Sequence, residues 1–205
     1  MSQSVIAPLC HLKEACFRQD MLSENPSFLQ IGATSTNDAL AFLAACPSGR
    51  AAICEPDSKT FWTLRSVGRL QLVNMAVSDR EGIAQLWRVH EKPCANSLWL
   101  PKQHPNAKPE SVHVTTPAKL LTMLGWTSAD VLALDCESSE ISIMPLLSPC
   151  VFPQVWVEWH VAWGYYGPEV RRAMTAQMRA RGYATYPFQG NTNYSLFYPE
   201  SEPLR

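Results

Sequence analysis

The sequence has 205 residues, of which 46% are hydrophobic and 17% charged, a balance that excludes a disordered chain and is typical of one α/β domain with a large core. Its 17 basic and 18 acidic side chains leave a net charge of −1, so charge gives no reason to expect nucleic acid or an anionic membrane as a partner. The sequence shows no apolar run of membrane-spanning length, and residues 1–8 lack the basic and apolar regions of a signal peptide.

The first half of the chain predicts strands that alternate with helices. In residues 8–21, apolar side chains recur at helical spacing, so we expect a helix within an N-terminal extension that covers residues 1–26. Buried strands are predicted at 27–31, 51–54 and 70–76, a further strand at 83–89, and helices after Asn37 and over 58–67.

The second half begins with a segment that proline excludes from helices and central strands. Four prolines fall between Lys92 and Pro109, so we expect a surface loop over residues 92–112, long enough to have a functional role. The remaining predicted elements are helices at 117–125 and 168–181, strands at 131–134 and 154–159, and a closing hairpin of 183–188 with 193–198.

This alternation of strands and helices predicts the fold class. We expect one domain over residues 1–205, an α/β protein built as a Rossmann-like three-layer α/β/α sandwich. Its sheet should be mostly parallel and doubly wound, and the closing hairpin should add an antiparallel strand.

A turn of small residues and a carboxylate point to a nucleotide-binding site. The apolar run 28–31 ends at Gly32 and Ala33, and the next predicted strand ends at Glu55 and Pro56. A glycine turn lets the backbone approach a ligand closely, and a carboxylate at the tip of the next strand can accept hydrogen bonds from both ribose hydroxyls. Proline after Glu55 favours an extended exit that would hold the carboxylate over the ligand. The alternative is a tight turn and a solvated carboxylate that bind nothing.

Carboxylates and a histidine follow two later strands. Asp135 and Glu137 come at the carboxyl end of the fourth strand, the edge at which open α/β sheets bind ligands. They can attract a cationic group of a ligand, and one of them can act as a base; helix capping by Asp135 and solvent exposure of Glu137 and Glu140 are the alternative. His160 alternates with Glu158 on the fifth strand and is a candidate proton acceptor, although such a pair is more often a structural hydrogen bond.

Five stretches of the sequence occur in a regular order, at 28–33, 55–57, 72–79, 132–140 and 155–160. In that order they resemble the FkbM-type methyltransferases that use S-adenosylmethionine. The resemblance covers nearly the whole chain and implies a seven-stranded sheet whose last strand is antiparallel. It also implies that S-adenosylmethionine is the cofactor, with binding residues at Gln30, Gly32, Ala33, Glu55, Pro56, Ser78, Asp79 and Asp135. Ser78 and Asp79 would contact the adenine ring.

The chain departs from the family pattern at three positions. Thr34 and the residues after it replace a stretch in which the family usually has a second glycine. Ser138 stands where the family typically has glycine, and Gln30 stands where many members have Asp. The two changes at glycine positions motivate an alternative function, a catalytically inactive binding or scaffold protein that keeps the methyltransferase fold.

We therefore predict an S-adenosylmethionine-dependent methyltransferase that acts on a hydroxyl of a small molecule or glycan. The oxygen acceptor is implied by the family alone, and His160 or Glu137 is the predicted catalytic base. A nicotinamide-dependent oxidoreductase is a further alternative, but it would need a glycine-rich loop that the sequence lacks. Seven scattered cysteines without a Cys-x-x-Cys pair indicate reduced thiols in a cytoplasmic protein, and no ligand spacing predicts a metal site.

Overall fold

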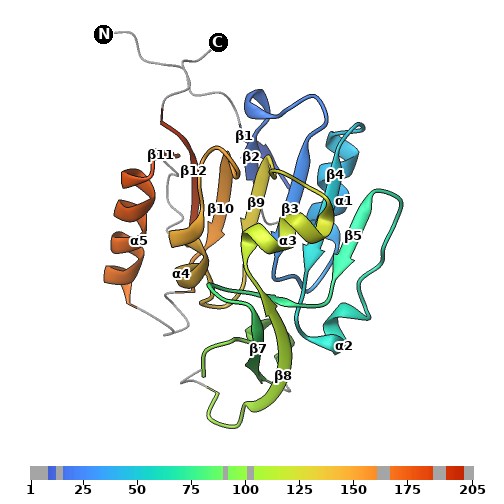
Figure 1. Ribbon diagram of the computed structural model, residues 1–205, viewed down its shortest axis with the longest axis vertical. Helices are drawn as coiled ribbons and strands as arrows, with labels where there is room; N and C mark the ends of the chain where they lie inside the picture. The colour runs from blue at the N-terminus through green and yellow to red at the C-terminus, as the bar shows by residue number, and fades with distance from the viewer. Residues whose placement is uncertain are drawn as a thin grey trace.

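A seven-stranded sheet forms the centre of the molecule (Figure 1). The computed structural model describes residues 9–12, 16–89, 92–100, 104–160, 167–186 and 193–200. In spatial order the strands are β11 (Tyr183–Thr185), β12 (Tyr194–Pro199), β10 (Gln154–Glu158), β9 (Val131–Leu134), β3 (Ser27–Ile31), β4 (Arg50–Cys54) and β5 (Leu70–Val73). All neighbouring pairs from β10 to β5 are parallel, whereas β12 runs antiparallel to both of its neighbours. The predicted fold class is confirmed: this is a Rossmann-like α/β fold whose mostly parallel, seven-stranded sheet has an antiparallel last strand.

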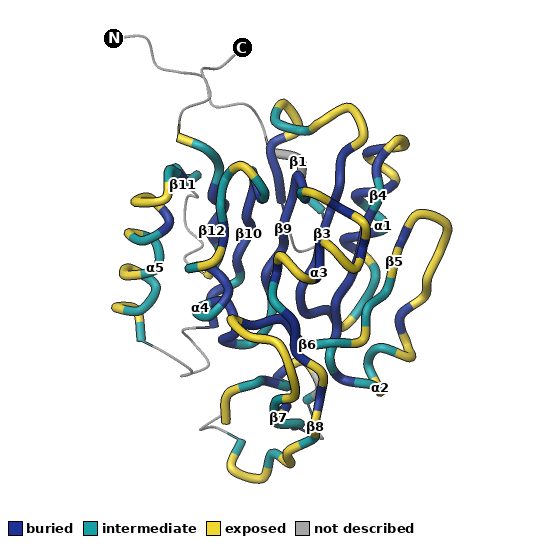
Figure 2. Tube along the Cα trace, in the orientation of Figure 1, coloured by how far each residue is buried: buried dark blue, intermediate teal, exposed yellow. Residues whose placement is uncertain are grey.

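Helices cover both faces of this sheet. They are α1 (Asn37–Ala45), α2 (Ser58–Phe61), α3 (Pro117–Leu124), α4 (Glu140–Ile143) and α5 (Pro168–Ala180), with 3-10 turns η1 (Gln19–Met21), η2 (Pro93–Ala95) and η3 (Met144–Leu146). On one face, Phe42 of α1 stacks on Phe28 of β3, with ring centroids 5.2 Å apart. On the other face, α3, α4 and α5 pack on a cluster that contains Leu29, the next residue of β3. Figure 2 shows the central strands buried, as expected for parallel strands covered on both sides.

The ends of the helices follow local sequence signals. α3 begins where Thr116 accepts a backbone hydrogen bond at 3.3 Å, and it ends at Gly125, whose φ is +69°. α2 is shorter than the predicted helix over 58–67. It ends at Phe61, and the chain then turns at Gly68, with φ +51°, to enter β5. Among the described residues, we find no helix with the length and apolar character that crossing a membrane requires.

The predicted N-terminal helix is wrong where the structure describes that segment. β1 (Leu9–His11) and β2 (Cys16–Arg18) form an antiparallel hairpin instead. The Gln154 side chain accepts from the Arg18 N–H at 2.6 Å and donates to the Arg18 carbonyl at 3.0 Å. Phe17 packs edge-on against Phe42, with ring centroids 5.4 Å apart. These contacts with distant residues outweigh the helical spacing of the apolar side chains.

A second, three-stranded sheet lies at the carboxyl ends of the central strands (Figure 1). It consists of β6 (Ala76–Val77), β8 (Lys108–Thr115) and β7 (Gly82–Arg88), in that order. The strand predicted over 70–76 therefore divides, since its first part joins the large sheet as β5 and its end begins the small one.

The predicted loop over residues 92–112 is shorter than expected, because its last residues already belong to β8. Pro109 is tolerated there for a physical reason. At its level β8 pairs with Trp87 of β7, whereas the pairing with β6 involves Val114 and Thr115 only. Among the described strands, none pairs with the other side of β8 at Pro109. The proline is tolerated because no partner there needs the backbone N–H that it lacks.

Asp130 ties the amino ends of β3 and β9 together. Its Oδ2 accepts from the Ser27 N–H at 2.9 Å and from the Ser27 hydroxyl at 2.7 Å, and its Oδ1 accepts from the Ser23 N–H at 2.8 Å. The Asp130 N–H in turn donates to the Ser27 hydroxyl at 3.1 Å. This buried carboxylate fixes the register in which the two central strands start.

Replacing Asp130 by Ala should lower the free energy of unfolding by about 3–5 kcal/mol, because hydrogen bonds to a charged group contribute about 1.5–3 kcal/mol each and the buried donors lose their acceptor. Urea unfolding followed by circular dichroism measures the loss. Glu81→Ala, at an exposed carboxylate outside the large sheet, is the control and should change stability by less than about 0.5 kcal/mol. Equal stability of the two variants would contradict the role of Asp130.

Candidate functional site

A cavity of about 360 Å³ lies at the carboxyl ends of β3, β4, β9 and β10. This is where the strand order reverses, because β3 has β4 on one side and β9 on the other. Open α/β sheets bind ligands at this point, and about 300–1,000 Å³ is the usual size of a small-molecule site. The cavity wall contains these residues that the sequence predicts for the site: Gly32, Ala33, Glu55, Pro56, Asp135, Glu137 and His160.

Gly32 forms the turn between β3 and the cavity. Its N–H donates to the Cys54 carbonyl at 2.9 Å, and the N–H of Asp135 donates to the Ile31 carbonyl at 3.0 Å. The φ of Gly32 is +81°, and a Cβ at this position would collide with the Asp135 carbonyl oxygen. Glycine is required here because two backbone segments meet, in addition to any approach of a ligand.

Glu55 is buried at the end of β4 and is held by the backbone on both sides. Its Oε2 accepts from the Ala33 N–H at 3.0 Å, and its Oε1 accepts from the Asp57 N–H at 2.8 Å. Burial raises the pKa of Glu55 to about 7, although these two hydrogen bonds oppose the shift. Each carboxylate oxygen has more than one lone pair, so both can still accept a hydrogen bond from a ligand in the cavity.

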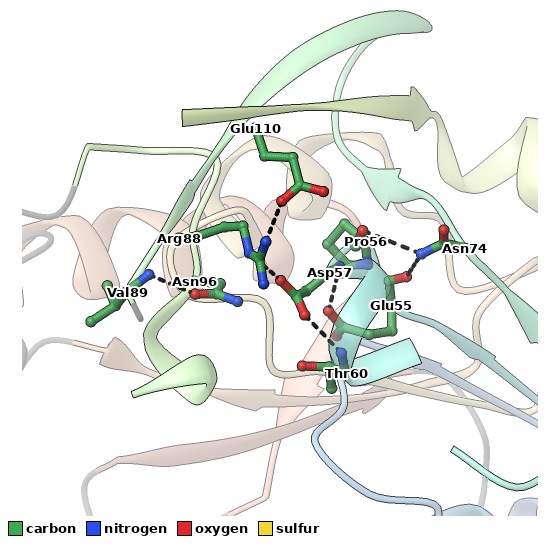
Figure 3. Close-up of polar contacts among 9 residues, drawn as sticks. All are labelled: Glu55, Pro56, Asp57, Thr60, Asn74, Arg88, Val89, Asn96 and Glu110. Carbon is green, nitrogen blue, oxygen red and sulfur yellow. Dashed lines mark hydrogen bonds and ion pairs between the residues drawn. The ribbon is translucent and has the colours of Figure 1, made fainter. Parts of the chain in front are cut away.

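Asn74 fixes the backbone that follows Glu55 (Figure 3). Its side-chain amide donates to the Glu55 carbonyl at 2.8 Å and to the Pro56 carbonyl at 3.2 Å. The extended exit expected from Pro56 is therefore held by a side chain from the next strand's end. Glu55 keeps its position over the cavity for this reason.

A charge cluster joins the small sheet to the large one (Figure 3). Asp57 caps α2 by accepting from the Thr60 N–H at 2.7 Å, and it lies 2.6 Å from Nε of Arg88 on β7. The same guanidinium contacts the Glu110 carboxylate on β8 at 2.5 Å. The cluster anchors both long strands of the small sheet beside Glu55, so this sheet forms a wall of the cavity.

The loop of residues 92–100 completes that wall. Ser97 exchanges backbone hydrogen bonds of 2.7 and 3.1 Å with Trp87, and its hydroxyl donates to the Glu137 carbonyl at 2.5 Å. Asn96 and Leu98, on either side of Ser97, line the cavity. Part of the segment that the sequence predicts as a long loop with a functional role therefore lines the cavity.

His160 lies within a cluster of carboxylates. Its Nε2 is 3.3 Å from Asp135 Oδ1 and 3.4 Å from Glu137 Oε1, and its Nδ1 is 3.4 Å from Glu140 Oε1. Burial disfavours the imidazolium, but the hydrogen bonds and negative charges of these carboxylates outweigh it and raise the pKa of His160 to about 11. Burial also raises the pKa of Glu137 to about 8, against the opposing charge of His160. In this state both groups hold their protons at neutral pH.

Glu140 and Ser138 differ from what the sequence suggests. Glu140 is fully buried rather than exposed, and its Oε1 accepts from the Cys136 N–H at 2.9 Å. Glu137 and Ser138 have φ values of +49° and +88°, so the chain adopts a conformation that favours glycine although glycine is absent. The Ser138 hydroxyl is buried and has no hydrogen-bond partner in the described part of the chain.

Gln30, Ser78 and Asp79 lie outside the cavity wall. Gln30 is buried within β3 and pairs with Ile53 and Ala133 of the neighbouring strands. Ser78 directly follows β6, where its N–H donates to the Thr115 carbonyl of β8 at 2.9 Å, and Asp79 is exposed beside it. The cavity does not bring these three predicted residues to Glu55.

Sequence reasoning missed the cavity residues that the small sheet and the last strand supply. They include Val77, Leu86 and Tyr194. Tyr194 reaches the site because β12 pairs antiparallel with β10, in a register that places it beside Glu158. For Tyr194, the predicted closing hairpin is a sequence signal that could have placed it near the site. The residues of the small sheet carry no sequence signal that identifies a site.

No protein-family model and no curated protein matches this chain. Among solved structures, the chain is similar to one in the fibrillarin/Nop5p complex at 11% identity, with a TM-score of 0.51 over 87% of this chain and 73% of the other. It is also similar to the Methanococcus jannaschii fibrillarin pre-rRNA processing protein at 10% identity (TM-score 0.48; 94% and 72% covered) and to the pyocyanin biosynthetic protein PhzM at 12% (0.40; 87% and 51%). At 11% identity, the likeness to the chain of the fibrillarin/Nop5p complex supports the Rossmann-like fold and nothing finer.

Replacing Ser138 by Gly should stabilise the protein by about 1 kcal/mol, because it relieves a left-handed conformation and removes a buried, unpaired hydroxyl. The free energy of unfolding in urea measures the gain. Ser139→Gly is the matched control: Ser139 has φ −68°, so glycine there should destabilise by about 0.5–1 kcal/mol. Loss of stability in both variants would show that the Ser138 conformation is not strained.

Proposed function

We propose that this protein is an S-adenosylmethionine-dependent methyltransferase of the FkbM type. Its acceptor would be a hydroxyl of a small molecule or glycan. The observation that carries the proposal is the open cavity at the reversal of strand order, with the Gly32 turn and the buried Glu55 carboxylate on its wall. The Rossmann-like methyltransferase fold supports it.

The donor would lie across the ends of β3, β4 and β9. Glu55 would accept from the ribose hydroxyls, and the backbone of Gly32 and Ala33 would lie along the amino-acid end of the donor. Asp135 would stabilise the sulfonium, since its carboxylate lies on the cavity wall, and Glu137 beside it would add a polar contact. Gln30, Ser78 and Asp79 have no part in this arrangement because they lie outside the cavity.

The acceptor would enter beside the small sheet and His160. Methyl transfer is an in-line displacement at a carbon bound to sulfur, so the protein has to align the donor with the acceptor and exclude water. Leu86 and Leu98 supply an apolar wall for this purpose, and His160 and Glu137 are the polar groups that would contact the acceptor oxygen. We further propose a cytoplasmic location, on the basis of the scattered thiols; cell fractionation tests it.

Two observations favour an enzyme over an inactive scaffold. The cavity is open rather than filled by side chains. The glycine that the family has at the position of Ser138 is absent, yet the backbone keeps the left-handed conformation that glycine would provide. The change from glycine to Ser138 therefore leaves the left-handed turn in place beside the cavity.

Replacing Glu55 by Ala should weaken the affinity for S-adenosylhomocysteine by about 10- to 100-fold, because a hydrogen bond to a charged group contributes about 1.5–3 kcal/mol. Isothermal titration calorimetry measures the change. Glu24→Ala, an exposed carboxylate beyond the other end of the sheet, is the control and should leave the affinity unchanged. An affinity unaltered by Glu55→Ala would refute the ribose contact, and no binding of S-adenosylmethionine at millimolar concentration would refute the methyltransferase.

Donor affinity should rise with pH between about pH 6 and about pH 8. The pKa of Glu55 is about 7, so its carboxyl is protonated below that pH and becomes a strong acceptor for the ribose hydroxyls above it. We expect an increase of up to about tenfold in the calorimetric affinity for S-adenosylhomocysteine. Glu55→Gln should remove this dependence, and an equal pH response in the two proteins would assign it to another group.

A further inference from the structure

We infer that Asp135, Glu137 and His160 form a binding site for one divalent transition-metal ion. Each of these residues offers one ligand atom, and the three atoms lie within 4.8 Å of one another. The sequence predicts no metal site because His160 is far along the chain from Asp135 and Glu137. The fold brings them together, since Asp135 and Glu137 follow β9, and His160 follows the adjacent parallel strand β10.

The distances between the ligand atoms suit a common ion. Nε2 of His160 is 3.3 Å from Asp135 Oδ1 and 3.4 Å from Glu137 Oε1. Imidazole and carboxylate ligands lie about 2.0–2.2 Å from Zn²⁺, so two neighbouring ligands of one ion are about 3.0–3.5 Å apart. An ion that displaces the protons of His160 and Glu137 can therefore bind between these atoms, since metal binding requires deprotonated ligands.

A buried carboxylate orients the histidine. Nδ1 of His160 lies 3.4 Å from Glu140 Oε1, and Glu140 is itself held by the Cys136 N–H. In metal sites the second nitrogen of a ligating histidine usually contacts a carboxylate, which fixes the tautomer and turns the other nitrogen to the ion. Glu140 occupies that place, and Nε2 of His160 faces the two other carboxylates.

Acidic side chains outnumber basic ones around the cavity, which favours a bound cation. Besides Asp135 and Glu137, the cavity wall contains Glu55 and Glu158, and none of its described residues is lysine or arginine. The Oε2 atoms of Glu137 and of the fully buried Glu140 have no hydrogen-bond donor in the described residues. A divalent ion would compensate this excess of acceptors.

The ligand set selects the class of metal. Carboxylate oxygens suit Mg²⁺, Ca²⁺ and Mn²⁺, whereas an imidazole nitrogen favours Fe²⁺ or Zn²⁺, so the mixed set points to a transition metal, for which Mn²⁺ serves as a spectroscopic probe. Three protein ligands leave at least one coordination position open to the cavity, as in catalytic rather than structural sites. Under the proposed function, on which this step alone rests, the acceptor hydroxyl would occupy that position and lose its proton to water. Its oxygen would then bond to the methyl carbon as the carbon–sulfur bond breaks and S-adenosylhomocysteine leaves.

Mn²⁺ binding to the full chain tests the site, after treatment with a chelator and without any methyl donor. Titration followed by electron paramagnetic resonance should show one Mn²⁺ per chain, and pulsed measurements should show coupling to a nitrogen nucleus from His160. Asp135→Asn and Glu137→Gln should each weaken the affinity by at least about tenfold, and His160→Gln should abolish the nitrogen coupling. Glu158→Gln is the matched control: it removes a carboxylate from the same cavity and should change the affinity less than about threefold.

Absence of Mn²⁺ and Zn²⁺ binding at millimolar concentration would overturn the inference, and so would binding without nitrogen coupling in the unaltered protein. Circular dichroism identifies a variant that fails to fold, and the nitrogen coupling of the unaltered protein does not depend on any variant. The donor is absent from these measurements. A failed metal site is therefore distinguishable from a failed methyltransferase, which the titration with S-adenosylmethionine tests by itself.

Discussion

The meeting of two backbone segments at Gly32 and Asp135 determines the rest of the site. β3 and β9 are adjacent parallel strands, and their carboxyl ends come so close that a side chain at position 32 has no room. This contact places the turn that leads to Ala33 beside the segment that carries Asp135 and Glu137. It also brings the N–H of Ala33 to Glu55, so the carboxylate, the turn and the acidic segment form one wall.

The sequence predicts the elements whose stability is local. Ser27–Ile31 and Val131–Leu134 are buried strands with clear ends, and α3 has both of its terminal signals. The N-terminal segment fails as a prediction because its structure depends on Gln154, far along the chain. In the small sheet, β7 matches the predicted strand over 83–89, but β8 is missed because Pro109 excludes a central strand by rule, although β8 is unpaired on one side at that position.

The sequence likewise predicts some residues of the candidate site and not others. Glu55 and Gly32 can be found from their positions at strand ends, where the chemistry of nucleotide binding needs them. Glu140 cannot, because a carboxylate on a short helix is ordinarily solvated, whereas here it is buried with the Cys136 N–H and His160 as partners. Ser138 shows the limit of motif comparison, since the backbone conformation persists after the residue type that usually accompanies it has changed.

The chain segment that forms the small sheet leaves the large sheet and returns to it at almost the same place. Ala76 and Val114 are paired neighbours, so the residues between them form an excursion that is closed at its base. Changes of length or side chain within this excursion leave the register of the seven main strands untouched, while they reshape the wall that Leu86 and Leu98 provide. Under the proposed function, recognition of the donor is thereby physically separable from recognition of the acceptor. A graft of this single segment is the smallest exchange by which such a protein would gain a different acceptor and keep its donor.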